Sequence, residues 1–409
     1  MALDKIMEIK KAYFDRFGDD GLYSYGNCRT YLDHWVERLD IKEYKDILFD
    51  LHRVQCEDLI LLHYRLPHSI DGADYYKAYG GLFAECRSVV IDVRKGELAL
   101  TPFKKFMNLN ERSDTSEERI RELLRSAKVV EFSDKLDGSM QSARFYDGKL
   151  VMSGSRAVDR NASFRLENGY RYVETHDNYM SMIRDNPDLT FIFEYIFDDD
   201  VHVVNYSSKE KGLYLIGIRN SIDGREYHYY EVLKFADEYG VMTTVLSNID
   251  LDSAMDTLDK ADGLEKEGFV VNIDGFRIKM KSRDYVMLNT AIWSLGEDDH
   301  VLFNAVRFDM LDDVLPKINE PLRSKIASKA DKIIEHARVK EAKVMKYMSM
   351  LNKSGLSEKK DVMVWINDNV PHDVSTYVRA LYLGKDVDYL KGVKVEDILS
   401  NTCTDDALM

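Results

Sequence analysis

The run Lys135-Leu136-Asp137-Gly138-Ser139 places a lysine directly before a tight turn. The preceding residues, 129–132, are typical of a β-strand that ends near this lysine. Glycine lets the backbone approach a ligand closely, and neighbouring N–H groups can bind phosphate. A lysine held there could attack phosphorus as a nucleophile. A lone motif of this kind also fits an exposed lysine at a β-turn. Other residues of the chain must therefore show whether Lys135 is a nucleophile.

Two carboxylates and a set of cations elsewhere in the chain favour a nucleotide-binding site around this lysine. Glu194 lies inside one apolar strand-like segment, and Glu267 opens another. A buried carboxylate is costly unless it binds a cation or accepts strong hydrogen bonds. Together with nearby cations, these acids resemble a metal site beside a triphosphate-binding cradle, which separate surface salt bridges would explain poorly. The basic residues of the set are Arg87, Lys105, Lys279 and Lys281, of which the last two share one strand face.

The order of these motifs resembles the covalent nucleotidyltransferase superfamily, and within it the T4 RNA ligase 1 family. The nucleophile motif K-x-D-G is weak alone, but its occurrence together with the other motifs in the family order is specific. The resemblance covers roughly residues 80–290. Its matching segments are 85–87, 102–111, 135–138, 193–195, 267–270 and 279–282.

The resemblance implies that Lys135 attacks the α-phosphorus of ATP and forms a lysyl-AMP. Lys279 and Lys281 are then expected at the α-phosphate, where with a metal ion they would lower the pKa of Lys135. The metal, Mg²⁺ or Mn²⁺, is expected on Glu267. Glu194 is expected to bind the ribose hydroxyls or a second cation.

Further site residues follow from position in the family pattern. Arg87 and Lys105 would contact the leaving pyrophosphate or the 5′-phosphate of RNA, and Arg156 would substitute for a family lysine. The remaining nucleotide-binding residues are expected to be Gly138, Ile216, Gly268, Val270 and Tyr285, with Ile216 and Val270 against adenine. Tyr285 fits an ordinary core tyrosine equally well.

The distribution of residue types along the chain predicts an α+β fold with antiparallel sheets, followed by an all-helical domain. Short β-branched and aromatic runs fill roughly 82–290, with hairpin signals at Asp147-Gly148 and Asp274-Gly275. Leucines and a valine at 48–62 indicate a helix that leads into a strand. We therefore expect an adenylation domain over residues 1–290, with its N-terminal extension, and a helical domain over 291–409 that binds the RNA substrate.

The helical region carries an amphipathic pattern over 322–351 and a second stripe of basic side chains. Such a stripe could follow a phosphate backbone, or it could be a solvated face paired with acids. Both interpretations stay open. The stripe consists of Lys325, Lys329, Lys332, His336, Lys340 and Lys343.

The amino-acid composition restricts the partners and the cellular compartment that we expect for the protein. The net charge of −15 disfavours a general nucleic-acid footprint, so binding depends on local clusters of Lys and Arg. The four cysteines are scattered, and neither a membrane span nor a signal peptide is evident. We expect a monomer in the cytoplasm of a bacterial or phage-infected cell.

The favoured function is an ATP-dependent RNA ligase that joins 5′-phosphate and 3′-hydroxyl ends. Its substrate is expected to be a nicked tRNA anticodon loop or a similar stem-loop, with a separate end-healing kinase or phosphatase as a possible partner. The alternatives are a DNA ligase, an mRNA capping guanylyltransferase, or a non-catalytic RNA-binding relative. A nucleophilic lysine is not needed for binding alone, which counts against the last.

Overall fold

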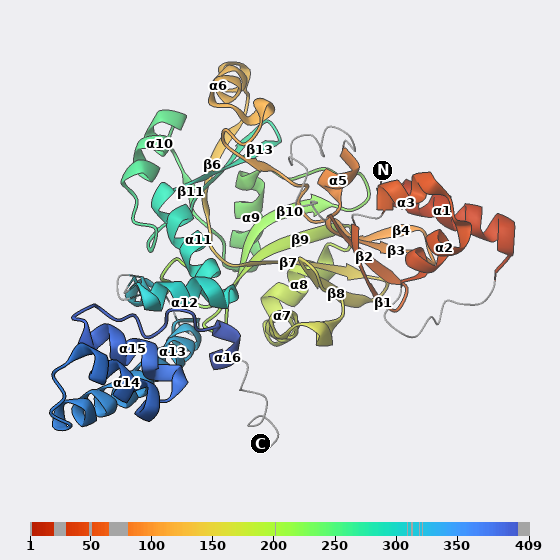
Figure 1. The fold of residues 1–409 in the computed structure, drawn as a ribbon. Helices are drawn as coiled ribbons and strands as arrows, with labels where there is room; N and C mark the ends of the chain where they lie inside the picture. The colour runs from red at the N-terminus through yellow and green to blue at the C-terminus, as the bar shows by residue number, and fades with distance from the viewer. Residues whose placement is uncertain are drawn as a thin grey trace. The chain divides into compact units, whose positions relative to one another are not determined.

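A computed structural model describes residues 2–19, 30–48, 51–64, 81–200, 202–308, 310–311, 314–318, 320 and 322–399 (Figure 1). The chain divides into two compact units, Met1–Val286 and Met287–Met409. The first unit contains three β-sheets with helices packed on them. The second is helical in its described residues.

The first sheet has the order β1-β2-β3-β4 and is antiparallel. Helices α1 and α2 cover one of its faces, where large side chains such as Tyr13 and Trp35 form the core. The other face packs against β7 and β8 through a smaller apolar cluster. The elements of this part are α1 (Ala2–Phe17), α2 (Tyr31–Leu39), α3 (Lys42–Leu48), β1 (Leu51–Cys56), β2 (Leu59–Tyr64), α5 (Gly81–Glu85), β3 (Arg87–Asp92) and β4 (Glu97–Leu100).

The second sheet has the order β10-β9-β7-β8 and is also antiparallel. Every residue of β9 is buried, which is typical of a central strand covered on both faces. Three helices, α7, α8 and α9, share an apolar core with it. The elements are β7 (Ser139–Tyr146), β8 (Lys149–Gly154), α7 (Phe164–Thr175), α8 (Asp177–Asp185), β9 (Leu189–Ile196), β10 (Gly212–Asn220) and α9 (Tyr229–Tyr239).

The third sheet has the order β11-β6-β12-β13-β5, with only the β13–β5 pair parallel among its pairings. Helices α6 and α10 pack on it through apolar side chains, and Figure 1 shows both beside β6 and β13. The elements are β5 (Met107–Asn108), α6 (Glu117–Ser126), β6 (Val130–Lys135), β11 (Leu246–Ser247), α10 (Leu251–Lys260), β12 (Gly268–Ile273) and β13 (Phe276–Lys281).

The second unit has a core of its own, formed by valines, leucines and isoleucines of α13, α14 and α15. No helix in the described ranges is both long and apolar enough to cross a membrane. Helix α11 (Arg283–Glu297) contains the boundary between the two units. The helices that follow it are α12 (Asp299–Arg307), α13 (Leu322–Lys353), α14 (Lys359–Asn369), α15 (His372–Tyr382) and α16 (Val395–Leu399).

The predicted α+β class with antiparallel sheets is confirmed, as are both hairpins. Asp147-Gly148 and Asp274-Gly275 have positive φ at both residues, as a tight two-residue turn between twisted strands requires. The helix predicted within 48–62 is wrong beyond Leu48, because residues 51–64 form the β1–β2 hairpin. The leucines of this hairpin pack on both faces of the sheet, so that their spacing along the chain resembles that of a helix.

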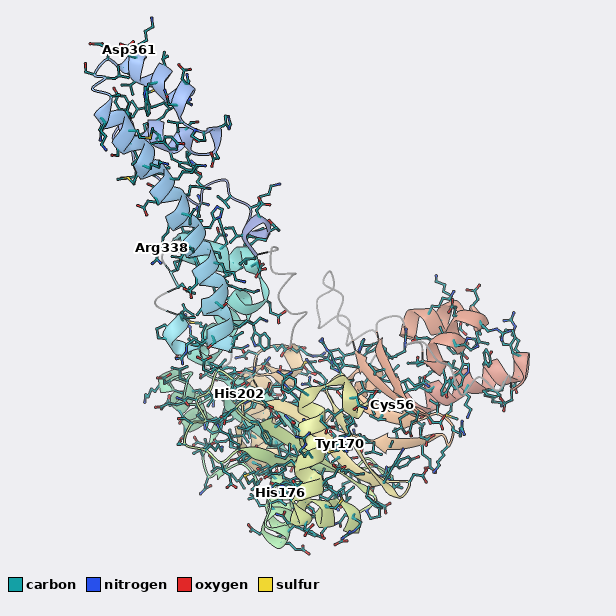
Figure 2. The ribbon with its side chains drawn as sticks, turned by 90° about the horizontal axis from the view of Figure 1, so that it is seen from below. Cys56, Tyr170, His176, His202, Arg338 and Asp361 are labelled. Atoms are coloured by element: carbon teal, nitrogen blue, oxygen red, sulfur yellow. The ribbon has the colours of Figure 1, made fainter. Side chains whose placement is uncertain are left out.

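The predicted basic stripe lies on α13, but much of it is used for packing within the helical unit. Lys329 pairs with Asp299 at 2.6 Å and Lys343 with Asp373 at 2.7 Å. Lys340 lies 5.6 Å from the centre of the Tyr377 ring. Figure 2 labels Arg338, an exposed α13 residue outside this stripe. The interpretation as a face paired with acids therefore holds for Lys329 and Lys343.

Phe191 in β9 offers a test of the second sheet. It is fully buried and lies between Ala143 and Ile218 on the neighbouring strands. Phe191→Ala should lower the free energy of unfolding by about 3–5 kcal/mol, because it removes buried surface and leaves a cavity. Phe164→Ala, at a ring that is 52% exposed, is the control and should cost far less. Urea unfolding followed by circular dichroism would measure both, and equal losses would contradict the assignment.

Candidate active site

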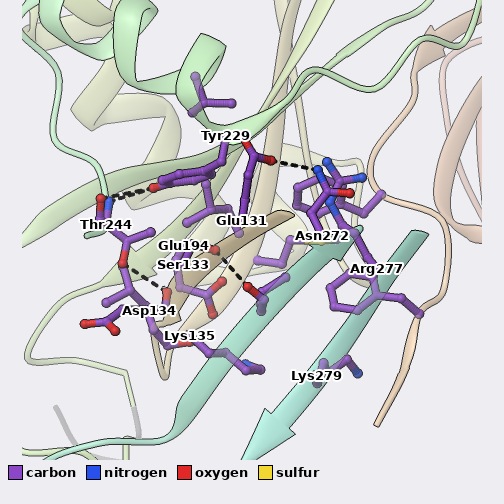
Figure 3. A pocket seen from close by; sticks show the side chains of 18 of the residues that line it. Glu131, Ser133, Asp134, Lys135, Glu194, Tyr229, Thr244, Asn272, Arg277 and Lys279 are labelled. Carbon is purple, nitrogen blue, oxygen red and sulfur yellow. Dashed lines mark hydrogen bonds between the residues drawn. The ribbon is translucent and has the colours of Figure 1, made fainter. Parts of the chain in front are cut away.

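A cavity of about 350 Å³ lies in the first unit between the second and third sheets (Figure 3). This volume falls in the range of small-molecule sites. Its wall combines cationic, acidic and aromatic side chains. The predicted site residues that line it are Arg87, Lys135, Gly138, Glu194, Ile216, Val270, Lys279 and Lys281.

Strand register brings the two key lysines together. Gly268, the first residue of β12, lies opposite Lys135 of β6 on one side and opposite Lys281 of β13 on the other. The three residues therefore form one row across three adjacent strands. Glu267 directly precedes this row, so its carboxylate can reach the lysines on both sides.

Glu267 does reach both of them. Its Oε2 accepts a hydrogen bond from Nζ of Lys135 at 2.8 Å, and its Oε1 lies 3.0 Å from Nζ of Lys281. The carboxylate is only 2% exposed. A buried charge is tolerated when it is paired and hydrogen-bonded, and here each oxygen has its own ammonium partner.

This pairing sets the charge of Lys135 in the structure. The neighbouring cations together with a metal ion were expected to lower the pKa of Lys135, and beside Glu267 alone that pKa is raised. Burial acts to lower it, and the charges of Glu267 and Glu194 outweigh burial. Lys135 is therefore an ammonium, and not a nucleophile, until something else occupies the carboxylate of Glu267.

Glu194 lies within β9 at 8% exposure. Burial raises its pKa to about 8, against the opposing charge of Lys135. Within the described ranges, no three His, Cys, Asp or Glu side chains gather into a metal site. Glu194 and Glu267 could hold a divalent cation only together with ligand oxygens, as Mg²⁺ commonly does with substrate phosphates.

Two glycines permit this close packing. A Cβ on Gly138 would lie 2.6 Å from the carbonyl oxygen of Tyr195 and 2.9 Å from Cγ of Glu194. A Cβ on Gly268 would lie 1.9 Å from the carbonyl oxygen of Met280. Any side chain at either position would push apart the strands that carry the site.

The cationic part of the wall contains Arg87, Lys279 and Lys281 in addition to Lys135. Burial, with the charges of Arg87 and Lys105, lowers the pKa of Lys279 to about 7. Its Nζ lies 5.1 Å from the centre of the Phe106 ring. The cations near Lys279 thus disfavour its charged form, and an anionic ligand there would restore that form.

The other part of the wall is apolar and aromatic, with polar groups at its end. Ile216 and Val270 line it, as predicted for an adenine-binding site. Phe103 packs closely against Gly217, where a Cβ would lie 2.0 Å from the ring. Sequence reasoning missed the rest of this wall, which includes Phe103, Phe106, Glu131, Tyr227, Tyr229, Thr244, Asn272 and Arg277. The alternation that identified Lys279 and Lys281 could also have identified Arg277.

Asp137 was missed as a functional residue, although it stands inside the nucleophile motif. Its Oδ2 accepts hydrogen bonds from the backbone N–H groups of Val203 at 2.7 Å and Val204 at 3.0 Å. Its Oδ1 accepts one from the hydroxyl of Tyr285 at 2.8 Å. The hydroxyl of Tyr206 accepts a hydrogen bond from the Asp137 backbone N–H. Asp137 thus fixes the turn that carries Lys135.

Tyr285 does not line the cavity, and its buried hydroxyl serves Asp137 instead. The core interpretation therefore fits it better than nucleotide contact. Lys105 and Arg156 also lie outside the cavity lining, although Ser155 next to Arg156 belongs to it. The charge of Lys105 acts on Lys279 of the wall, and the charges of Lys105 and Arg156 both act on His63.

Lys279 gives a prediction with a defined pH dependence. Its pKa is lower in the folded protein than in the unfolded chain, so unfolding takes up a proton between about pH 7 and 10.4. Lys279→Met should raise the free energy of unfolding by on the order of 1–2 kcal/mol at pH 7, and this gain should shrink toward pH 10. Exposed Lys104→Met is the control. Urea titrations at pH 7 and pH 10 would measure the free energy of unfolding of each variant. A gain in stability that does not change with pH would contradict the lowered pKa of Lys279.

Comparison with known proteins finds similar proteins among RNA ligases. Residues 85–285 match the family model of RNA ligases of the T4 RNA ligase 1 type. A putative RNA ligase of Thermovibrio ammonificans is 26% identical over 292 residues, which are 68% of this chain and 70% of that protein.

Two solved structures are also similar. An archaeal ATP-dependent RNA ligase aligns over 77% of this chain and 83% of its own, with 15% identity and a TM-score of 0.46. A mutant of Naegleria gruberi RNA ligase with ATP and Mn aligns over 42% of this chain, with 19% identity and a TM-score of 0.35. The match spans about half of the Naegleria chain, 54%. The segment that matches the RNA ligase family, 85–285, carries Lys135, Glu267 and Lys281.

Proposed function

We propose that this protein is an ATP-dependent RNA ligase with Lys135 as its nucleophile. The observation that carries the proposal is the buried carboxylate of Glu267, which pairs with Lys135 and Lys281, two lysines in the wall of the cavity. The cavity pairs an apolar, aromatic part that suits adenine with a cationic part that suits phosphates. Lys135 lies where the two parts of a bound nucleotide would meet.

The proposed reaction has three steps. Nζ of Lys135 attacks the α-phosphorus of ATP, so that a P–N bond forms and pyrophosphate leaves. An oxygen of the RNA 5′-phosphate then attacks the same phosphorus, which breaks the P–N bond and gives a 5′–5′ pyrophosphate-linked adenylate. Finally the 3′-hydroxyl of the second RNA end attacks the 5′-phosphate and AMP leaves. Positioning and charge neutralisation are the main contributions that a protein makes to such transfers.

The charges of the chain suit the first step. Lys135 is protonated while Glu267 is free to pair with it. A divalent cation held by Glu267 and Glu194 together with ATP phosphates would neutralise the carboxylates and polarise the phosphates. Loss of the carboxylate partner lowers the pKa of Lys135 and releases its lone pair for attack. Lys279 gains a proton when an anion arrives, and thus stabilises charge on the α-phosphate.

We further propose that the acceptor is RNA with 5′-phosphate and 3′-hydroxyl ends, such as a nicked tRNA stem-loop, after a separate kinase or phosphatase has prepared the ends. The helical unit would bind the RNA. The exposed members of the basic stripe, Lys325 and Lys332, remain available for this role because no ion pair with another described residue involves them. The free thiols of Cys56 and Cys86 fit a reducing compartment such as the cytoplasm.

Adenylation is tested by incubating the protein with ATP labelled at the α-phosphate and a divalent cation, followed by denaturing electrophoresis. Wild type should retain label, and Lys135→Ala should retain none because the attacking amine is gone. Glu267→Gln should slow labelling by about a hundredfold or more, as loss of a charge-stabilising group commonly does. Lys149→Ala, on an exposed hairpin, should label like wild type. Equal labelling of Lys135→Ala would refute the assignment, and labelling by GTP alone would favour a capping enzyme.

The acceptor is tested with the same protein. A stem-loop RNA nicked in its loop, with a 5′-phosphate and a 3′-hydroxyl, should be sealed, whereas nicked duplex DNA should not. Replacement of Lys325 and Lys332 together by Gln should weaken RNA binding and flatten its salt dependence by about 0.7 per lost phosphate contact. Sealing of DNA in preference to RNA would contradict the proposed acceptor class.

A further inference from the structure

The turn that follows Lys135 also connects the two sheets that enclose the cavity. Lys135 is the last residue of β6 in the third sheet, and Ser139 is the first residue of β7 in the second sheet. Residues 136–138 are all that lies between these two strands. The position of Lys135 relative to groups of the second sheet, such as Glu194, therefore depends on the conformation of this short turn.

Segment 203–206, in the connection between β9 and β10, holds this turn through hydrogen bonds. The backbone N–H groups of Val203 and Val204 donate to the carboxylate of Asp137. Asp137 donates its own backbone N–H to the hydroxyl of Tyr206 at 2.6 Å. One segment of four residues thus binds both the side chain and the backbone of Asp137.

The same segment also contacts the stretch of chain that leads to Glu267. The backbone N–H of Asn205 donates to the carbonyl oxygen of Leu264 at 2.7 Å. Leu264 stands three residues before Glu267, whose carboxylate accepts a hydrogen bond from Nζ of Lys135. Segment 203–206 is therefore bonded to the backbone on both sides of this lysine–glutamate pair.

Tyr206 is the residue of this segment whose side chain takes part in the bonding. It is 9% exposed, and burial raises the pKa of its hydroxyl, with the charges of Glu194 and Glu267 acting in the same direction. The hydroxyl thus lies within electrostatic range of both carboxylates. Tyr206 lies outside the cavity lining, so it can act on the reaction only through Asp137 and the turn.

We infer that Tyr206 is a positioning residue for the transfer of AMP to Lys135. Its hydroxyl fixes the backbone of Asp137, and thereby sets where Nζ of Lys135 lies relative to the α-phosphorus of ATP. A displacement of reacting atoms by about 1 Å can slow a reaction by about a hundredfold. The inference rests on the proposed ligase function and adds to it a residue that lies outside the motif segments of the sequence.

The test is Tyr206→Phe, which removes the hydroxyl and keeps the ring. Tyr170→Phe is the matched control, because Tyr170, labelled in Figure 2, is also 9% exposed. Its hydroxyl likewise accepts a backbone N–H, that of Met152 at 2.8 Å. Each substitution removes a hydrogen bond of the same kind, so both should lower the midpoint of thermal unfolding slightly and leave the protein folded.

The labelling of Lys135 by ATP is then followed in a single turnover over a series of ATP concentrations. Tyr206→Phe should lower the rate at saturating ATP by about tenfold or more, while the half-saturating ATP concentration stays within about twofold of wild type. Tyr170→Phe should change neither value. A general loss of stability would act alike in both variants, and a lost contact with ATP would raise the half-saturating concentration.

Each other outcome counts against the positioning role. An unchanged rate in folded Tyr206→Phe, an equal loss of rate in Tyr170→Phe, or a rise in half-saturating ATP without a loss of rate would refute it. If only Tyr206→Phe loses its cooperative thermal transition, Tyr206 serves folding and the inference is also refuted. Failure of the ligase proposal is recognised separately, because wild type would then show no labelling of Lys135.

Discussion

The arrangement of the site depends on one buried carboxylate between two ammonium groups. Glu267 has almost no contact with solvent, and each of its oxygens faces a lysine from a different strand. Removal of either partner would leave a charge buried with incomplete compensation, which is far more costly than the pair itself. The register of β6, β12 and β13 is therefore fixed by electrostatics as well as by hydrophobic packing. The glycine that opens β12 makes the row possible, since no side chain fits there.

Short sequence patterns predicted those parts of the site that depend only on residues close together in the chain. Both Asp-Gly hairpins need residues that tolerate positive φ, and alternation placed Lys279 and Lys281 on one face. The acid inside the apolar β9 strand likewise signalled a site, because burial of a carboxylate requires a reason. The protonation state of Lys135 could not be predicted in this way. It depends on a contact between residues 132 positions apart, and the sequence does not show which of several charges lies closest.

The same limit explains the other misses. The hydrogen bonds from Val203, Val204 and Tyr285 to Asp137 connect distant segments, and nothing near Asp137 in sequence announces them. On α13 the spacing of lysines is equally suited to phosphates and to acids of neighbouring helices, and only the packed unit shows that Lys329 and Lys343 have carboxylate partners. Periodicity therefore identifies a face, while its partner is set by tertiary structure.

The ion pair of Lys135 also has a chemical consequence for the resting protein. An amine whose pKa is lowered toward neutrality has a free lone pair and can react with electrophiles that reach it. An ammonium held by a buried carboxylate is inert toward them, because it has no lone pair to offer. Nucleophilicity thus appears only when the carboxylate is engaged elsewhere. The same contact that stabilises the strands protects the lysine from being consumed before its substrate arrives.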